Sequence, residues 1–190
     1  MKSLIIAPKL LLILILLGSS TSCFDALDLE PRYGINSATV YSEPNNYYNV
    51  LAKLYGGYSL TGQNGPAGNP DVTIGRDEGF SQYLRCHWNM QELPTEEAVC
   101  AWTDPGIPEL NTSEWNSQNS FVNMMYSRIF FQVAICNEFI FYCSEDWMSE
   151  KGFSETDKAK IRIYKAEARF LRALSYYHAI DLFGNVPLVT

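Results

Sequence analysis

Basic side chains are scarce in this sequence. Lysine and arginine number 14 against 21 aspartates and glutamates over 190 residues, so the formal net charge is −7. Nucleic-acid phosphates and anionic lipid headgroups both attract basic side chains, and an acidic chain approaches neither by charge alone. The composition therefore excludes a nucleic-acid partner, and any attachment to a membrane is expected to be covalent.

Metal ligands and catalytic motifs are equally few. His87 and His178 are the only histidines, and neither has other ligand types beside it in the sequence. The five cysteines form no CxxC pair and no Cys/His spacing typical of zinc. No GxSxG or HExxH motif is present, and no nucleophile has a spaced base. We therefore expect no metal, no cofactor and no enzymatic activity.

Two patterns invite a functional interpretation that their details do not support. Seven glycines between residues 56 and 79 lack the GK[ST] ending of a phosphate-binding loop, so a solvated, ordered loop is the better interpretation. Carboxylates of the kind that glycosidases pair occur at Glu96, Glu97, Asp104 and Glu109. On an acidic chain such carboxylates are more often solvated loop charges, so a surface glycosidase is the weakest hypothesis.

A membrane-spanning run is also missing. The apolar run from Leu10 to Leu17 has eight residues, whereas a bilayer crossing needs about 20. Lys2 and Lys9 flank the start of the leader and small residues follow the run, which is the pattern of a secretory signal peptide over residues 1–22. Removal of this peptide takes away both lysines and makes the net charge −9.

Cys23 directly follows the small residues of the signal peptide. This arrangement resembles a bacterial lipobox, in which the thiol is diacylated and becomes the mature N-terminus. The usual lipobox has Leu three residues before the Cys, and Ser20 stands there instead. Lipidation at Cys23 is the favoured interpretation, with simple secretion as the alternative, and two acyl chains are enough for stable anchoring. Residues 23–41 then form a polar tether with an extended backbone.

Three helices are predicted from the spacing of apolar residues over 42–190. Ser42 can cap the first, with Pro44 in its first turn, and its apolar face is Tyr47, Leu51, Leu54 and Tyr58. A second helix over 117–143 is apolar on more than one side, which predicts burial between neighbours. The third, over about 156–183, is capped by Ser154 or Thr156 and ends at Gly184. Its predicted core face is Ile163, Ala166, Phe170, Ala173 and Tyr177.

The remaining segments are irregular. Prolines and scattered aromatic residues between 80 and 116 predict long loops with at most a short helix over 79–88. Cys136 and Cys143 share a helix face about 10 Å apart, which is too far for a disulfide, so both are expected to be small buried residues. A Cys86–Cys100 disulfide remains geometrically possible in an oxidising compartment.

The predicted fold class is mainly α, with tetratricopeptide-like helical hairpins and long irregular loops. The two closing helices have a seam of alanine and aromatic residues that is typical of such a pair. One pair cannot bury its own apolar faces, and about three repeats are normally needed. The final helix and the apolar tail over 185–190 therefore require partners, either outside these residues or on the Tyr47–Tyr58 helix.

The C-terminal stretch AEARFLRALSYYHAIDLFGNVPLVT resembles the helix and following turn of the SusD/RagB family, the outer-membrane nutrient-binding lipoproteins of Bacteroidetes. Earlier blocks resemble the N-terminal half of the same family: GPAGNPDV, DEGFSQYLR, WNMQELPTEEAVCAW and MYSRIFFQVAICNEFI. The resemblance covers residues 23–190, with 42–190 as the N-terminal helical region. Family members are several times longer, so the chain is expected to be truncated relative to the family.

The resemblance implies a cell-surface lipoprotein of the outer membrane that binds a glycan or another nutrient and performs no catalysis. It also implies a partner, a SusC-like TonB-dependent transporter, to which the bound oligo- or polysaccharide is passed. A helical-repeat scaffold that binds proteins and has no ligand site of its own is the competing hypothesis.

Trp102 resembles, by its position, an aromatic residue of the family's glycan-binding platform, and Asp104 is close enough in sequence to be its polar companion. Sugar rings have apolar faces that stack on aromatic side chains, and their hydroxyls need planar polar partners. The other interpretation is that Trp102 only anchors its loop to the helices. Trp88 and Trp115 are expected to lie in the core.

Overall fold

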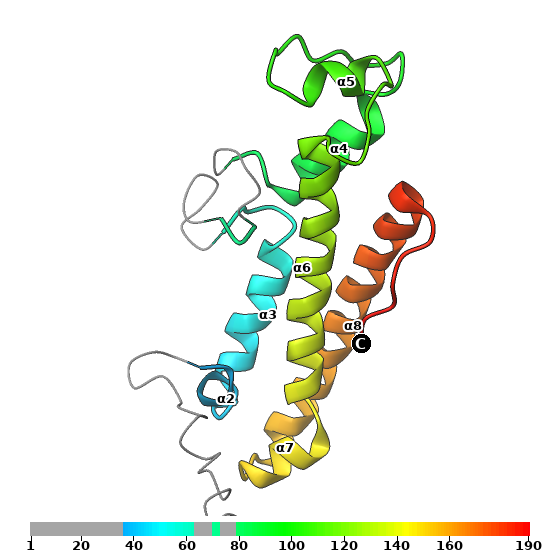
Figure 1. The fold of residues 1–190 in the computed structure, drawn as a ribbon. Coiled ribbons are helices and arrows are strands. Elements are labelled where there is room, and N and C mark those ends of the chain that lie inside the picture. The colour runs from blue at the N-terminus through cyan, green and yellow to red at the C-terminus, as the bar shows by residue number, and fades with distance from the viewer. Residues whose placement is uncertain (1–35, 63–69, 73–78) are drawn as a thin grey trace, which may run out of the picture. The chain divides into compact units, whose positions relative to one another are not determined.

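The computed structural model describes residues 36–62, 70–72 and 79–190. Within them the chain is mainly helical, as predicted, and forms no strand beyond one isolated bridge between Gly62 and Pro70. The predicted signal peptide, Cys23 and most of the tether lie outside the described residues. The helices are α2 (Ser37–Val40), α3 (Asn46–Gly56), α4 (Tyr83–Glu92), α5 (Ile107–Asn111), α6 (Ser120–Tyr142), α7 (Glu145–Glu150) and α8 (Glu155–Phe183) (Figure 1).

The chain divides into two units, residues 1–39 and 40–190. In the first, the side chain of Asn36 accepts a hydrogen bond from the backbone N–H of Thr39 at 2.7 Å, as a residue that caps a helix does. This cap accompanies the short helix α2, so the prediction of an extended backbone is wrong at the described end of the tether. The other helices of the described residues belong to the second unit.

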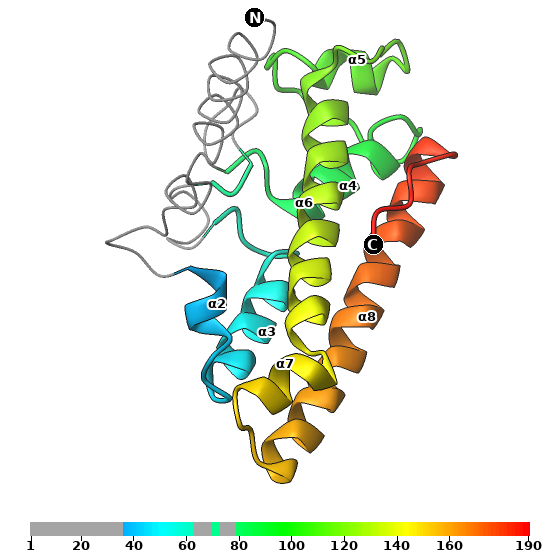
Figure 2. The same cartoon turned by 60° about the horizontal axis from the view of Figure 1, so that its bottom comes forward.

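Helices α6 and α8 form an antiparallel hairpin, and α3 packs against both (Figures 1 and 2). Lys165 near the middle of α8 donates to the carbonyl of Cys143 at 3.1 Å, whereas Arg172, further along, donates to Asn137 at 2.7 Å. Because residues later in α8 meet residues earlier in α6, the two helices run in opposite directions. Helix α4 packs against α6 as well, so α6 is buried on several sides, as its apolar pattern predicted.

Local capping defines the ends of the long helices. Asn119 accepts hydrogen bonds from Phe121 and Val122 at the start of α6, and Ser154 accepts one from Asp157 at the start of α8. Ser154 was one of the two predicted caps, and Gly184 ends α8 with φ of 70°, as predicted.

The first predicted helix begins later than expected. Helix α3 starts at Asn46, and Ser42 is not its cap. Residues 41–45 instead form tight turns, in which the N–H of Asn46 donates to the carbonyl of Glu43 at 3.1 Å. Helices α5 and α7 were not predicted, because five or six residues are too few to show helical periodicity.

The buried face of α8 is not the predicted one. Its buried residues are Ile161, Ala168, Leu171, Ser175 and Ala179, whereas Ile163, Phe170 and Tyr177 are 61–65% exposed. Both faces of this helix are apolar, and the narrower one packs on α3 and α6. Its alanines and serine allow the close approach of backbones that bulky aromatic residues would prevent.

The C-terminal tail turns back along its own hairpin. The backbone of Val189 exchanges two hydrogen bonds with the hydroxyl of Tyr176, at 2.9 and 2.7 Å, and accepts a third from Asn137. The tail therefore lies on α6 and α8 rather than on α3 as one alternative had it. Leu188 is 78% exposed.

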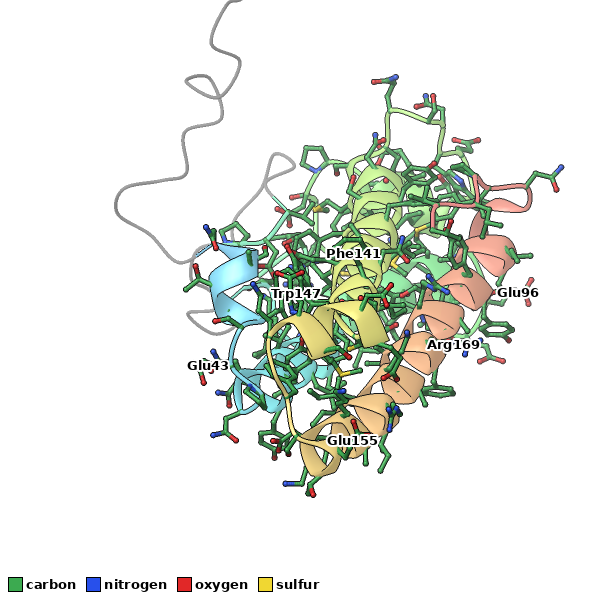
Figure 3. The ribbon with its side chains drawn as sticks, turned by 90° about the horizontal axis from the view of Figure 1, so that it is seen from below. Glu43, Glu96, Phe141, Trp147, Glu155 and Arg169 are labelled. Carbon is green, nitrogen blue, oxygen red and sulfur yellow. The ribbon has the colours of Figure 1, made fainter. Side chains whose placement is uncertain are left out.

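Aromatic side chains close the end of the unit where α6 turns into α7. Tyr41 stacks on Tyr142 with ring centroids 4.4 Å apart, and the hydroxyl of Tyr47 donates to the carbonyl of Tyr142 at 2.8 Å. The indole N–H of Trp147 donates to the carbonyl of Tyr41 at 3.1 Å. Figure 3 views this end from below, with Trp147 labelled on α7 and Phe141 at the end of α6.

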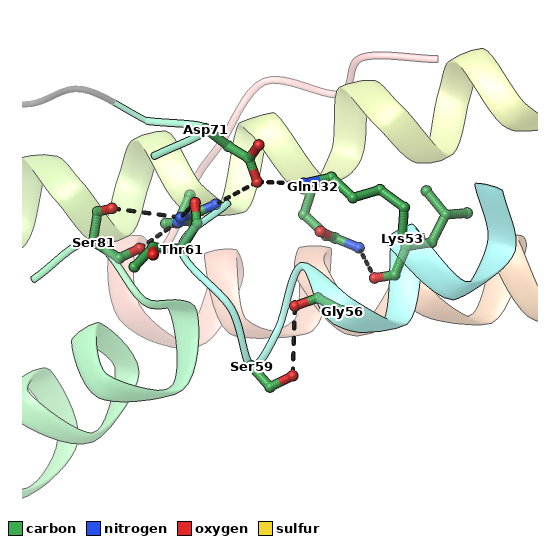
Figure 4. Close-up of polar contacts among 9 residues, drawn as sticks. Lys53, Gly56, Ser59, Thr61, Asp71, Ser81 and Gln132 are labelled. Carbon is green, nitrogen blue, oxygen red and sulfur yellow. Dashed lines mark hydrogen bonds and ion pairs between the residues drawn. The ribbon is translucent and has the colours of Figure 1, made fainter. Parts of the chain in front are cut away.

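A buried arginine connects α6 to the segment that follows α3. Arg128 is 1% exposed, and its guanidinium donates to the carbonyls of Thr61 and Ser81. A third contact joins it to the carboxylate of Asp71 at 3.4 Å, and Lys53 of α3 donates to the same carboxylate oxygen at 2.7 Å (Figure 4). Burial lowers the pKa of Arg128, and Asp71 opposes this shift.

We predict that Arg128→Met destabilises the chain by about 3–5 kcal/mol, because it removes one partner of a buried ion pair and takes the donor from the buried carbonyl of Ser81. The free energy of unfolding is measured by urea denaturation followed by circular dichroism. Arg162→Met is the control, since Arg162 makes two close hydrogen bonds to Glu145 but lies at the surface. Equal loss in both variants would contradict a special role of burial.

Candidate functional site

Trp102 lies in the loop between α4 and α5, and its side chain is 56% exposed. The guanidinium carbon of Arg85 on α4 is 5.4 Å from the centroid of its ring and 4.4 Å from that of Phe80. Both distances suit cation–π contacts, which hold the guanidinium between two aromatic side chains. One guanidinium nitrogen of Arg85 also donates to the carbonyl of Gly79 at 3.2 Å. The indole of Trp102 is therefore held in place while much of it faces solvent.

A pocket of about 330 Å³ opens beside this indole. We call it the Trp102 pocket, and its lining residues are Arg85, Trp88, Asn89, Cys100, Trp102 and Ile107. Three of them, Arg85, Trp88 and Asn89, are neighbours on the surface of α4 because they are separated by three and four residues. The pocket thus combines two indoles, a guanidinium and an amide, which come from α4 and from the loop between α4 and α5.

Trp88 is 49% exposed, so the prediction that it belongs to the core is wrong. Helix α4 packs inward through the face that carries Tyr83 and Cys86. Trp88 comes two residues after Cys86, which places it about 200° around the helix. Its size and apolarity suggested burial, but the orientation of α4 leaves it at the mouth of the pocket. The sequence contained one indication that Trp88 lies beside Arg85 on the helix surface, namely their separation of three residues.

Asn89 is the most buried polar residue of the pocket, with 7% of its surface exposed. Within the described residues its side-chain amide makes no hydrogen bond. An asparagine amide offers two donors and one acceptor, and the amide atoms of Asn89 are not among the fully buried unpaired polar atoms of the described residues, so they still reach solvent. Because Asn89 lines the pocket, a ligand with hydroxyl groups would find free donors and an acceptor there.

The loop that carries Trp102 is tied to α5. The side chain of Asn111 accepts from the N–H of Cys100 at 3.3 Å and donates to its carbonyl at 2.7 Å. Asp104 lies in the turn that leads into α5, where its carbonyl accepts from Ile107 at 3.0 Å. Asp104 is not among the residues that line the pocket, so the structure brings only Trp102 of the two predicted residues into it.

The four cysteines of the described residues are free thiols, so the possible Cys86–Cys100 disulfide is not formed. Cys86 is buried, and its sulfur donates a hydrogen bond to the carbonyl of Phe80 at 3.1 Å. Burial raises the pKa of this thiol to about 12, so Cys86 is not a reactive thiolate at neutral pH. Cys136 and Cys143 are buried as predicted, and burial raises the pKa of both.

The two histidines, distant in sequence, meet between α4 and α8. The ring centroids of His87 and His178 are 4.4 Å apart, and Nδ1 of His178 shares a hydrogen bond of 2.8 Å with the hydroxyl of Tyr83. Burial lowers the pKa of both imidazoles below the ordinary value of 6.5, and Asp181 opposes the shift in each. Within the described part of the chain, no three His, Cys, Asp or Glu side chains converge as a metal site would require.

Comparison with known proteins identifies two relatives. The chain is 34% identical over 177 residues to the starch-binding protein SusD of Bacteroides thetaiotaomicron, a match that covers 93% of this chain and 29% of that protein. It is 27% identical over 81 residues to the SusD-like protein P2 of Formosa agariphila, covering 43% of this chain and 14% of that protein. No family model matches the chain.

The match covers only part of the length of SusD. The chain spans about 29% of the length of SusD, in agreement with the prediction that it is truncated relative to the family. Among the described helices, none combines the length and apolarity needed to cross a bilayer.

We predict that the contact between α4 and α8 weakens in mild acid. Because the folded chain lowers the pKa of His87 and His178, the unfolded chain takes up protons first, and stability present above pH 6.5 falls as the pH drops below it. The double variant His87→Gln, His178→Gln should show a flatter dependence of the unfolding free energy between about pH 7.5 and 5. Equal slopes in both proteins would contradict the assignment.

Proposed function

The chain belongs to the SusD family, and on that premise we propose that it binds a glycan at the outer face of the outer membrane. The relative with the longer match is named as a starch-binding protein. The observation that carries the proposal for this chain is the Trp102 pocket, where two half-exposed indoles flank a largely buried asparagine whose amide reaches solvent and makes no hydrogen bond in the described residues.

The chemistry of this pocket suits a sugar. The indoles of Trp88 and Trp102 offer flat apolar surfaces against which a pyranose ring can stack, and each buries a large area when covered. Asn89 supplies donors and an acceptor for hydroxyl groups beside the ring. Arg85 already contacts Phe80, Trp102 and the carbonyl of Gly79. It therefore serves to hold the indole of Trp102 in place at least as much as to contact a ligand.

Binding without catalysis is the activity that the site supports. Two of the carboxylates considered for a glycosidase, Glu96 and Glu97, lie exposed in the loop after α4. A third, Glu109, accepts a hydrogen bond from the N–H of Gly106 at 2.9 Å and so caps α5. Among the residues that line the Trp102 pocket there is no carboxylate, whereas glycoside hydrolysis needs two facing the bond that breaks.

The proposal extends to the cellular context implied by the resemblance. Lipidation at Cys23 would anchor the chain to the outer membrane, and the residues up to 41 would serve as a tether. A SusC-like TonB-dependent transporter would then take over the bound oligo- or polysaccharide. No cofactor is required for any of these steps, because the glycan is bound and passed on unchanged.

A second candidate is a helical-repeat scaffold that binds proteins. Its support is the exposed apolar face of α8, where Ile163, Phe170 and Tyr177 lie at intervals of seven residues and are each more than 60% exposed. A groove of about 830 Å³ between α8 and the C-terminal tail adjoins this face. Apolar surface of this kind is typical of protein contact sites.

Affinity electrophoresis separates the two candidates. We predict that gels containing amylopectin, galactomannan, arabinoxylan or levan include at least one that retards the chain, and that Trp102→Ala or Trp88→Ala weakens this binding at least about tenfold by removing a stacking surface. Phe141→Ala is the control, since this side chain is 69% exposed but lies in the last turn of α6, next to α7, whereas α4 lies beside the other end of α6 (Figure 1). If no gel retards the unmodified chain, the scaffold is favoured instead.

Lipid attachment has its own test. We predict that Cys23→Ala releases the chain from the membrane fraction, because the thiol that carries the acyl chains is gone. Metabolic labelling with a fatty-acid analogue should mark the unmodified protein only. Equal recovery of both proteins from the membrane fraction would mean that Ser20 prevents lipidation and that the chain is simply secreted.

A further inference from the structure

A second pocket, of about 290 Å³, is formed by the start of α5 and the loop that joins α5 to α6. We call it the Trp115 pocket, and its lining includes Gly106, Glu109, Glu114, Trp115 and Gln118. The side chain of Trp115 is 40% exposed, so the prediction that it lies in the core is wrong. The two pockets share α5, because Ile107 lines the Trp102 pocket and the neighbouring Gly106 lines this one.

Hydrogen bonds hold the Trp115 pocket in shape without a ligand. The N–H of Glu114 donates to the carbonyl of Glu109 at 2.9 Å, and the side chain of Asn119 donates to the carbonyl of Gly106 at 3.0 Å. Asn116 accepts from the N–H of Gln118 through its side chain at 2.8 Å. A site whose backbone is already ordered loses little entropy when it binds.

Gly106 contributes to this rigidity because it has no side chain. Its φ of 103° is a conformation that side chains rarely adopt, and an added Cβ would lie 2.8 Å from the hydroxyl of Ser120 and 2.9 Å from the ring of Phe121. The start of α5 can therefore lie directly against the start of α6. Trp115 and Gln118 of the intervening loop line the same pocket as Gly106.

Two of the polar side chains that line the Trp115 pocket, those of Glu114 and Gln118, are not used by the fold. Within the described residues, neither the carboxylate of Glu114 nor the amide of Gln118 makes a side-chain hydrogen bond. An exposed indole beside an amide and a carboxylate offers a stacking surface, two N–H donors and several acceptors. A sugar with free hydroxyls matches this set, whereas Glu109 and Glu114 together disfavour a uronic acid by repulsion between like charges.

We propose that the Trp115 pocket is a second subsite for a neutral sugar residue, so that the chain holds a polysaccharide at two places. This inference rests on the proposed function and narrows its ligand to neutral polymers long enough to occupy both pockets. Two weak subsites that share α5 bind a polymer that reaches both far more tightly than either binds a single sugar, because the second contact is intramolecular.

The test uses the whole chain in gels containing amylopectin, galactomannan or polygalacturonate. In whichever neutral gel retards the unmodified chain, Trp115→Ala is expected to weaken binding about five- to tenfold, and Gln118→Ala about twofold or more. Gln118→Ala guards against misfolding, since this exposed side chain bonds to nothing in the described residues. Asn49→Ala, which removes an exposed amide from α3, is the control and should migrate like the unmodified chain. Polygalacturonate should not retard the chain.

Each outcome has a distinct meaning. If Trp102→Ala abolishes retardation while Trp115→Ala and Gln118→Ala migrate like the unmodified chain, the second subsite is refuted and the proposed function stands. Retardation by polygalacturonate that exceeds that in both neutral gels overturns the preference for neutral sugars. If none of the three gels, nor those with arabinoxylan or levan, retards the unmodified chain, the proposed function fails together with the inference.

Discussion

The buried guanidinium of Arg128 is the contact on which the arrangement of the loops depends. The segment after α3 is rich in glycine and forms no regular element in its described parts, so it has little structure of its own to place its ends. Arg128 joins the carbonyls of Thr61 and Ser81 and the carboxylate of Asp71, which all lie in or beside that segment. Burying a guanidinium is costly, and these three acceptors offset the cost. Because Ser81 lies two residues before Tyr83, the first residue of α4, this contact helps to fix the position of α4.

Helix α4 both packs on the helical core and contributes residues to the Trp102 pocket. One face packs on α6 and touches α8 through Tyr83 and His178, whereas Arg85, Trp88 and the largely buried Asn89 line the Trp102 pocket. The loops that complete both pockets are held mainly by asparagine side chains, which pair with backbone groups of Cys100 and Gly106. Rigid loops on a helical support are a suitable platform for recognition, because little entropy is lost when a ligand binds.

Helix α8 carries the apolar surface that a protein partner would contact. It has two apolar faces, and the fold of residues 40–190 covers only the one with small side chains. The other presents Ile163, Phe170 and Tyr177 to solvent, beside the groove of the C-terminal tail. A chain that spans about 29% of SusD therefore has both features at once, an indole-lined pocket and an apolar contact face. The proposed glycan binding and a protein contact would use different surfaces of the chain.

Local rules were sufficient for the features that depend on neighbouring residues alone. The spacing of apolar residues determined α3, α6 and α8, while Ser154 and Gly184 determined the ends of α8, because periodicity and capping act within one turn. Tertiary structure decided the rest. It selected one of two apolar faces on α8, buried the charge of Arg128, brought His87 to His178, and turned Trp88 and Trp115 outwards. None of these outcomes is set by the residue itself, since each depends on which surface a neighbouring element covers and which carbonyls it brings within reach.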